Sequence, residues 1–364
     1  MVNKLVFENL KHRPIRTLLT VLAIGLQVTL VLTVVGLTRG LLEASAARAR
    51  GVGADIIIRP PGTSIIGLSS APMSEGMIRF AEKQPHVVQA QGVVVHGIGG
   101  LDSIHGIDLD KFSKMAGGLQ YLSGGPLQRK TDILIDDTEA AQRHVKVGDT
   151  LTIANQKWTV RGIVESGKLG KLFVDMRYLQ DITSNTGKIS LVYVKLDDPK
   201  NIQSVIDSLK KQLPDYPIYS MQEFLSYITP AQIPGVTPFI AVLIGLSIVF
   251  GFLVVFLAMY TAVLERTREI GILKALGATS PYVLGMLVRE TVVLEVVGAA
   301  IGILLSFLAR WIIMQTVPAS LPVVVVPDWW AWAGLISVAG SVLGAMYPGL
   351  KAARQDTIEA LAYE

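Results

Sequence analysis

The chain of 364 residues contains 51% hydrophobic residues, only 17% charged residues and no cysteine. Soluble domains average about 25% charged residues, so this balance excludes an ordinary cytosolic enzyme and is typical of a membrane protein with one sizeable polar part. The lack of cysteine excludes a disulfide framework, thiolate metal sites and a cysteine nucleophile. The net charge of +4 is small and scattered, which argues against a nucleic-acid partner.

The first sixteen residues predict an amphipathic helix that lies on the membrane surface. Val2, Leu5 and Leu10 share one helical face, and Pro14 ends the pattern. The apolar run that follows is about 22 residues long, which exceeds the ~7–15 of a signal-peptide core, so we expect a membrane span there and not a cleaved leader.

Four apolar stretches are candidates for membrane spans. They cover residues 17–38, 239–264, 291–313 and 329–350. At about 1.5 Å per residue, each can cross a hydrocarbon core of roughly 30 Å. The third is the weakest candidate because it contains Glu295 and Arg310.

Basic residues predict the orientation of these spans. Lys and Arg flank the N-terminal segment, the connection between spans two and three, and the C-terminal tail, whereas the loop between spans three and four has none. The positive-inside rule then places both termini in the cytoplasm and residues 46–225 outside it. Arg39, Arg48 and Arg50 oppose this trend, but long translocated domains are largely exempt from the rule.

Residues 46–225 form the only stretch with the pattern of a water-soluble domain. Short apolar runs separated by turn residues predict strands at 55–59, 133–135, 151–153, 158–164, 172–174 and 191–196. Residues 202–213 have helical periodicity. The expected fold is therefore a multi-pass α-helical membrane protein with four transmembrane helices and a mixed α/β extracytoplasmic domain between the first and second helices.

No catalytic, cofactor or metal site is expected in this chain. Residues 162–168 have the spacing of a phosphate-binding P-loop, but Leu169 stands where Ser or Thr must hold magnesium, and a strand is expected to follow. The histidines at 86, 96, 105 and 144 do not have the spacing of a tight metal-ligand pair.

The most informative segment follows span two. It reads ERTREIGILKALGAT over residues 265–279, with charges that can pair along a helix at the cytoplasmic surface. Ile270, Leu273 and Leu276 add an apolar face that needs a partner. The residues singled out for contact with a partner are Glu265, Arg266, Arg268, Glu269, Ile270, Gly271, Lys274 and Gly277. An ordinary positive-inside loop is the alternative reading.

These residues resemble the cytoplasmic motif of FtsX-like/MacB-type ABC transporter permeases. Three further segments are similar to that family in the same order: residues 9–20 at the entry to span one, 147–150 with 162–164 in the outer domain, and 347–361 at the end. Glu290 matches a family position, whereas Glu295 stands where the family usually has an uncharged residue.

The resemblance implies a permease in the bacterial inner membrane that works as a homodimer or with a paralogous permease. It implies a separate cytoplasmic ABC ATPase that binds the ATP, docking by the helix over 265–281, movement of the stalk and outer domain for export or efflux, and in some members a periplasmic adaptor. A membrane-anchored scaffold that regulates a cell-wall hydrolase remains the alternative.

The expected organisation follows from these assignments. It comprises 1–16 (interfacial helix), 17–45 (span one and stalk), 46–225 (core domain), 226–264 (stalk and span two), 265–281 (coupling helix), 282–313 (span three), 314–328 (loop), 329–350 (span four) and 351–364 (tail).

Two features within the spans lead to further predictions. A carboxylate as deep as Glu295 normally faces a partner, either Arg310 or a polar residue of another span. Two GxxxG motifs, beginning at Gly298 and Gly340, favour close helix packing within the chain, with contact across a dimer as the alternative.

Overall fold

The computed structural model describes residues 14–63, 71–99, 102–229, 236–317 and 321–354. The predicted interfacial helix over 1–16 lies almost entirely outside the described residues. The chain forms two compact units. The helical unit contains Met1–Thr38, Gly235–Ile313 and Val323–Glu364, and the α/β unit contains Arg39–Pro234 and Met314–Pro322.

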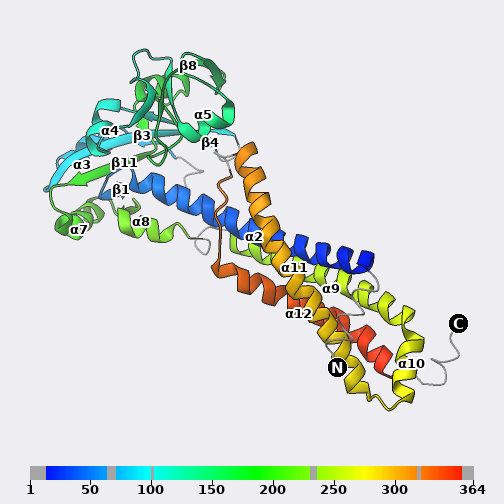
Figure 1. The fold of residues 1–364 in the computed structure, drawn as a ribbon. Coiled ribbons are helices and arrows are strands. Elements are labelled where there is room, and N and C mark those ends of the chain that lie inside the picture. The colour runs from blue at the N-terminus through cyan, green and yellow to red at the C-terminus, as the bar shows by residue number, and fades with distance from the viewer. Residues whose placement is uncertain (1–13, 64–70, 100–101, 230–235, 318–320, 355–364) are drawn as a thin grey trace. The chain divides into compact units, whose positions relative to one another are not determined.

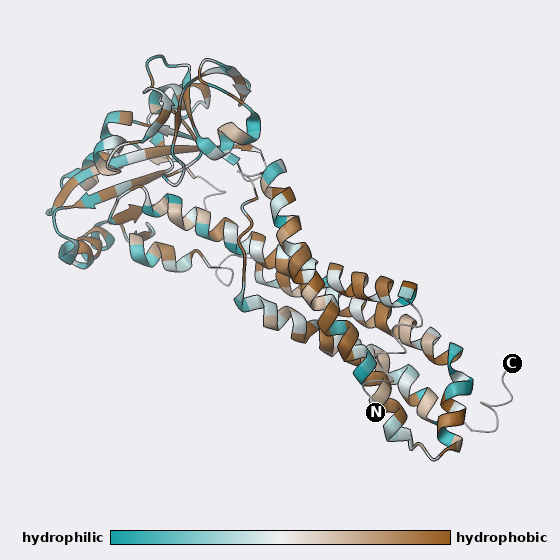
Figure 2. Ribbon diagram, viewed as in Figure 1, coloured by the Kyte–Doolittle hydropathy of each residue, from teal (hydrophilic) through white to brown (hydrophobic). Residues whose placement is uncertain are grey.

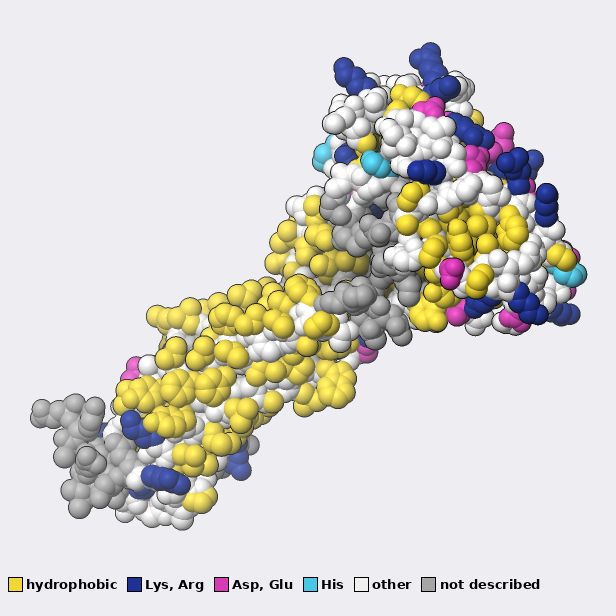
Figure 3. Space-filling model, turned by 180° about the vertical axis from the view of Figure 1, so that it is seen from behind, with side chains coloured by type: hydrophobic (Ala, Val, Ile, Leu, Met, Phe, Trp, Pro, Cys, Tyr) yellow, Lys and Arg dark blue, Asp and Glu magenta, His cyan; other side chains and the backbone are white. Residues whose placement is uncertain are grey.

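Within the described residues, four helices are long and apolar enough to cross a membrane. They are α2 (Pro14–Arg50), α9 (Val236–Glu265), α11 (Ser280–Thr316) and α12 (Asp328–Arg354), and the short α10 (Thr267–Ala275) joins α9 to α11 (Figure 1). Their outward sides are mostly hydrophobic (Figures 2 and 3), as lipid contact requires. This confirms the prediction of four transmembrane helices.

Glycines set the closest contacts between these helices. A Cβ on Gly302 of α11 would lie 2.6 Å from the backbone oxygen of Gly25 in α2, and one on Gly344 of α12 would lie 2.5 Å from that of Phe252 in α9. Such approaches are possible only for glycine. Both GxxxG motifs therefore pack helices of the same chain, which confirms the intrachain interpretation.

The α/β unit is built on a mixed sheet with the strand order β12-β1-β11-β3-β4-β9-β6-β8-β5, and β7 pairs with β8. The strands are β1 Ile56–Ile58, β2 Met73–Ser74, β3 Val87–Gly99, β4 Asp102–Ile107, β5 Tyr121–Gly124, β6 Asp132–Asp136, β7 Thr150–Ile153, β8 Gln156–Val164, β9 Leu172–Asp175, β10 Lys188–Ile189, β11 Leu191–Leu196 and β12 Ile218–Ser220. The helices are α3 Gly76–Glu82, α4 Leu109–Met115, α5 Asp137–Arg143, α6 Met176–Ile182, α7 Ile202–Gln212 and α8 Met221–Tyr227, with a 3-10 turn at Pro199–Asn201.

All six predicted strands and the predicted helix over 202–213 are confirmed as β1, β6, β7, β8, β9, β11 and α7. The longest strand, β3, was not predicted. Its sequence, VVQAQGVVVHGIG, contains three glycines and lacks a strict alternation of polar and apolar residues. It forms because β11 and β4 pair with it on either side.

The P-loop-like segment is a turn between two strands. β8 ends at Val164, Gly167 and Leu169 adopt left-handed backbone conformations, and β9 begins at Leu172, so the expected strand follows. Lys168 donates through Nζ to the carbonyl oxygens of Ala116 (2.8 Å) and Gly118. The lysine thus holds backbone groups of its own unit.

His105 lies inside the α/β unit on β4, against Phe173 of β9. Burial, together with the positive charge of Arg48, lowers the pKa of His105 to about 4, so the ring is neutral at physiological pH. No three His, Asp or Glu side chains gather as metal ligands in the described part of the chain. His105 is therefore a packed side chain of the sheet.

Candidate functional site

The candidate site is the corner made by α10. The helix of α9 ends at Glu265 because Arg266 leaves helical geometry (φ −112°, ψ 14°), and α10 then covers Thr267–Ala275. Gly277 has a φ of +98°, which allows the chain to turn into α11 at Ser280. The helical part of this corner is thus shorter than the segment 265–281 expected from the sequence.

One side of α10 packs into the helical unit. Ile270 is 3% exposed and contacts a cluster that includes Val263 of α9 and Val283 of α11. Gly271 and Thr267 are buried beside it. This corrects the expectation that Ile270 presents an apolar face to a partner protein: the apolar neighbours it needs are in its own chain.

The other side of α10 is open to solvent. Arg268 and Glu269 are exposed, as are two apolar side chains, Ile272 at 46% and Leu276 at 81%. We call these four residues the outward face of α10. Figure 2 shows the mixture of hydrophilic and hydrophobic residues on this short helix. Exposed apolar side chains flanked by charges are typical of a protein-contact surface.

A buried ion pair fixes the start of α10 to α11. Arg266 Nη1 lies 3.3 Å from Glu290 Oε2, and the Glu290 side chain is 1% exposed. Arg16 of α2 lies 3.2 Å from Glu265 and 3.9 Å from Glu290. Two guanidinium groups therefore compensate the desolvated carboxylate, and α2, α9 and α11 meet at one network of charges. The sequence singles out Glu265, Arg266 and Glu290, whereas only the structure identifies Arg16 as their partner.

A second anchor holds the end of α10. Lys274 Nζ donates to the carbonyl oxygen of Ala353 at 3.0 Å, and Ser280 Oγ donates to the same oxygen at 2.6 Å. Ala353 lies in the last turn of α12, whose carbonyl groups have no intrahelical partner. A lysine there also complements the negative end of the helix dipole. Together, the two anchors connect α10 to both of the following long helices.

The deep carboxylate is bound by hydroxyl groups. Glu295 is fully buried in α11, where Oε2 accepts from Ser337 Oγ at 2.6 Å and Oε1 accepts from Ser341 Oγ, both on α12. Of the two expected partners, the polar residue of another span is confirmed and Arg310 is wrong, because Arg310 donates to the carbonyl of Val323. Ser337 and Ser341 stand four residues apart, which places both hydroxyl groups on one face of a helix and is the sequence signal for this pair of partners.

These hydrogen bonds predict that substitutions of Glu295 lower the stability of the protein by different amounts. Interhelical hydrogen bonds in membranes contribute roughly 0.6 kcal/mol each on average, so we expect Glu295→Leu, which removes two of them, to lower the free energy of unfolding by roughly 1 kcal/mol. Glu295→Gln keeps one acceptor and should lose less. Unfolding in mixed micelles measures both variants, and equal destabilisation by glutamine and leucine would show that the hydroxyl contacts are not what the carboxylate provides.

Comparison with known proteins identifies both units. The family described as MacB-like periplasmic core domain matches residues 17–212, and the FtsX-like permease C-terminal family matches residues 241–357. The first match alone covers more than half of the chain.

Three curated relatives illustrate the similarity. The macrolide export ATP-binding/permease protein MacB of Hahella chejuensis is 24% identical and covers 97% of this chain, which spans 58% of that protein. YknZ of Bacillus subtilis, an uncharacterized ABC transporter permease, is 30% identical over 60% of this chain and 57% of its own length. An uncharacterized permease of Methanocaldococcus jannaschii is 25% identical over 61% and 59% of the two chains.

The chain thus matches less than two thirds of the length of each of these relatives. The two family matches cover its four apolar helices and most of the α/β domain between the first and second of them. The chain belongs to the FtsX-like, MacB-type family of ABC transporter permeases.

Proposed function

We propose that this permease transmits the ATP-driven movement of a separate cytoplasmic ATPase to its α/β domain, and that the outward face of α10 is the docking surface. The observation that supports this most directly is the division of α10 into two sides. Ile270 and Arg266 are buried in the permease itself, whereas Ile272 and Leu276 are exposed next to Arg268 and Glu269.

The anchors of α10 supply a route for the movement. A force on the outward face reaches α11 through the Arg266–Glu290 pair and α12 through Lys274 and Ala353. Because ion pairs and backbone hydrogen bonds hold both ends of α10, the helix moves with the bundle and does not yield alone. We infer that export or efflux results from this mechanical coupling, as the name of the MacB relative suggests for that protein.

The distribution of charge supports a cytoplasmic position for α10. Arg268 and Lys274 in this corner, and Lys351 and Arg354 at the end of α12, are basic residues next to span ends. The positive-inside rule places them in the cytoplasm of a bacterial cell and the α/β domain on the other side of the inner membrane. A second permease copy or a paralogue, and a periplasmic adaptor, complete the proposed assembly.

The test places a charge on the outward face. We expect Leu276→Glu and Ile272→Glu to abolish stimulation of the partner ABC ATPase, since a buried unpaired charge costs several kcal/mol and each 1.4 kcal/mol is tenfold in affinity. Val88→Glu is the matched control, at an apolar position in the α/β domain whose exposed fraction of 67% lies between those of Ile272 and Leu276. The measurement is ATP hydrolysis by the reconstituted pair at equal permease abundance.

Permease with either α10 variant should retain the melting temperature of the unmodified protein, because neither side chain is buried. Stimulated rates equal to those of Val88→Glu would contradict the docking surface. Such rates would favour the alternative of a membrane-anchored scaffold that does not engage an ATPase.

A further inference from the structure

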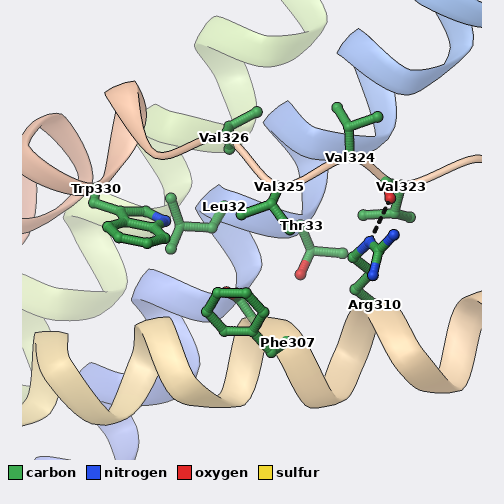
Figure 4. Close-up of a pocket in the computed structure, with 10 residues that line it drawn as sticks. Leu32, Thr33, Phe307, Arg310, Val323, Val324, Val325, Val326 and Trp330 are labelled. Atoms are coloured by element: carbon green, nitrogen blue, oxygen red, sulfur yellow. Dashed lines mark hydrogen bonds between the residues drawn. The ribbon is translucent and has the colours of Figure 1, made fainter.

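A fixed arginine lies at the end of α11 farthest from α10. Arg310 Nε donates to the carbonyl oxygen of Val323 at 2.9 Å (Figure 4). Val323 lies in the non-helical segment before α12, and the next residue, Val324, donates its backbone N–H to the carbonyl oxygen of Gly36 in α2 at 3.2 Å. The guanidinium group is therefore held against a backbone that is itself fixed to the bundle.

The described residues use little of the hydrogen-bonding capacity of Arg310. A guanidinium group has five N–H donors, and the bond to Val323 uses only the one on Nε. Among the described residues, neither terminal nitrogen has a carboxylate or carbonyl partner, and the side chain is exposed. This fork of donors suits the oxygen atoms of a phosphate group.

Aromatic side chains place Arg310 at the membrane–water boundary. Trp311 follows it on α11, and Trp329, Trp330 and Trp332 lie in the first turns of α12. The Trp330 ring packs edge-on against Phe307, with 6.2 Å between ring centroids. Tryptophan concentrates at the level of lipid headgroups. The unused donors of Arg310 therefore lie where lipid phosphates are found.

The surface beside Arg310 suits a hydrocarbon chain lying on it. The crevice under the arginine, lined by Leu32 and Thr33 among others, has a cavity volume of only about 10 Å³, the space of a single water molecule. An acyl chain cannot enter it. However, Leu304 and Phe307 are exposed on α11 and, with Arg310, follow each other at a spacing of three residues, so they form an apolar row that leads to the guanidinium group.

We propose that Arg310 and this row bind one phospholipid of the surrounding bilayer, with an anionic headgroup preferred. The terminal nitrogens of Arg310 hold the phosphate, and one acyl chain lies along Phe307 and Leu304. The lipid then stabilises the segment at Val323, because the same guanidinium group contacts both. A role for Arg310 as a brace of the Val323 carbonyl alone would leave the terminal nitrogens without a function.

The experiment uses the full-length permease in detergent, with phosphatidylglycerol or phosphatidylcholine added. Native mass spectrometry measures the bound lipid. We expect Arg310→Gln to reduce the retained phosphatidylglycerol by roughly fivefold, the equivalent of about 1 kcal/mol for one basic residue at a lipid surface. Arg310→Lys should be intermediate, because lysine keeps the charge and loses the fork. Arg79→Gln, which removes an exposed arginine of α3, should change nothing.

A second measurement distinguishes lipid binding by Arg310 from a purely structural role of its hydrogen bond to the Val323 carbonyl. Phosphatidylglycerol should raise the melting temperature of the unmodified permease, and Arg310→Gln should remove that rise. Equal lipid retention by Arg310→Gln and the unmodified protein would overturn the proposal, as would a melting temperature lowered by the same amount in both lipids. Displacement of phosphatidylglycerol by millimolar inorganic phosphate would show a site for free anions and would also overturn it.

Discussion

Permease carrying Glu290→Ala is expected to lose roughly 3–5 kcal/mol of stability, because the change removes the buried carboxylate that lies 3.3 Å from the Arg266 guanidinium group. Arg16 lies 3.9 Å from Glu290 and loses a neighbour as well. The free energy of unfolding of the detergent-solubilised protein is the measurement. Glu265→Ala is the matched control on the same network: its side chain is 43% exposed, so its loss should cost less than about 1 kcal/mol.

A double variant tests whether the Arg266–Glu290 ion pair does more than stabilise the fold. Arg266→Met combined with Glu290→Leu removes both charges and fills their volume, so most of the lost stability should return. If the pair also transmits movement from α10, this double variant will remain folded yet stimulate its ATPase less than the unmodified permease. A double variant as unstable as Glu290→Ala would show that the charges are not compensating one another.

Gly302→Leu is expected to separate α2 from α11 and to cost roughly 3 kcal/mol or more. A Cβ at this position would meet the backbone oxygen of Gly25 at 2.6 Å, and backbone cannot rotate away as a side chain can. The separation would also break the bond from Thr29 Oγ1 to the carbonyl oxygen of Gly302, which is 3.0 Å long. The folded fraction after detergent extraction and the unfolding free energy measure the loss.

Gly285→Leu is the control for this substitution, on the same helix and with the same change in size. No atom lies within 4 Å of a Cβ built at Gly285, so leucine there should be neutral or should stabilise α11 by up to about 1 kcal/mol through its helix propensity. Equal stability of the two leucine variants would contradict the close packing of α2 and α11.

The sequence by itself determined the features that depend on composition along the chain. Four long apolar stretches can form helices that cross a bilayer, where the backbone hydrogen bonds must be made within the chain because no water is present. The strands β6, β8 and β11 could be predicted because turn residues flank each of these short apolar runs. The motif over 265–279 was also visible, because so many charges at the end of a span are unusual.

Only the tertiary structure decided which side of each element meets the rest of the protein. Periodicity assigns Ile270 and Leu276 to an apolar part of α10, but the position of α9 and α11 buries the first and leaves the second exposed. Glu295 likewise has serine partners on α12, 42 and 46 residues further along the chain, because of the register between α11 and α12. Such register depends on packing between distant segments, which local sequence patterns do not contain.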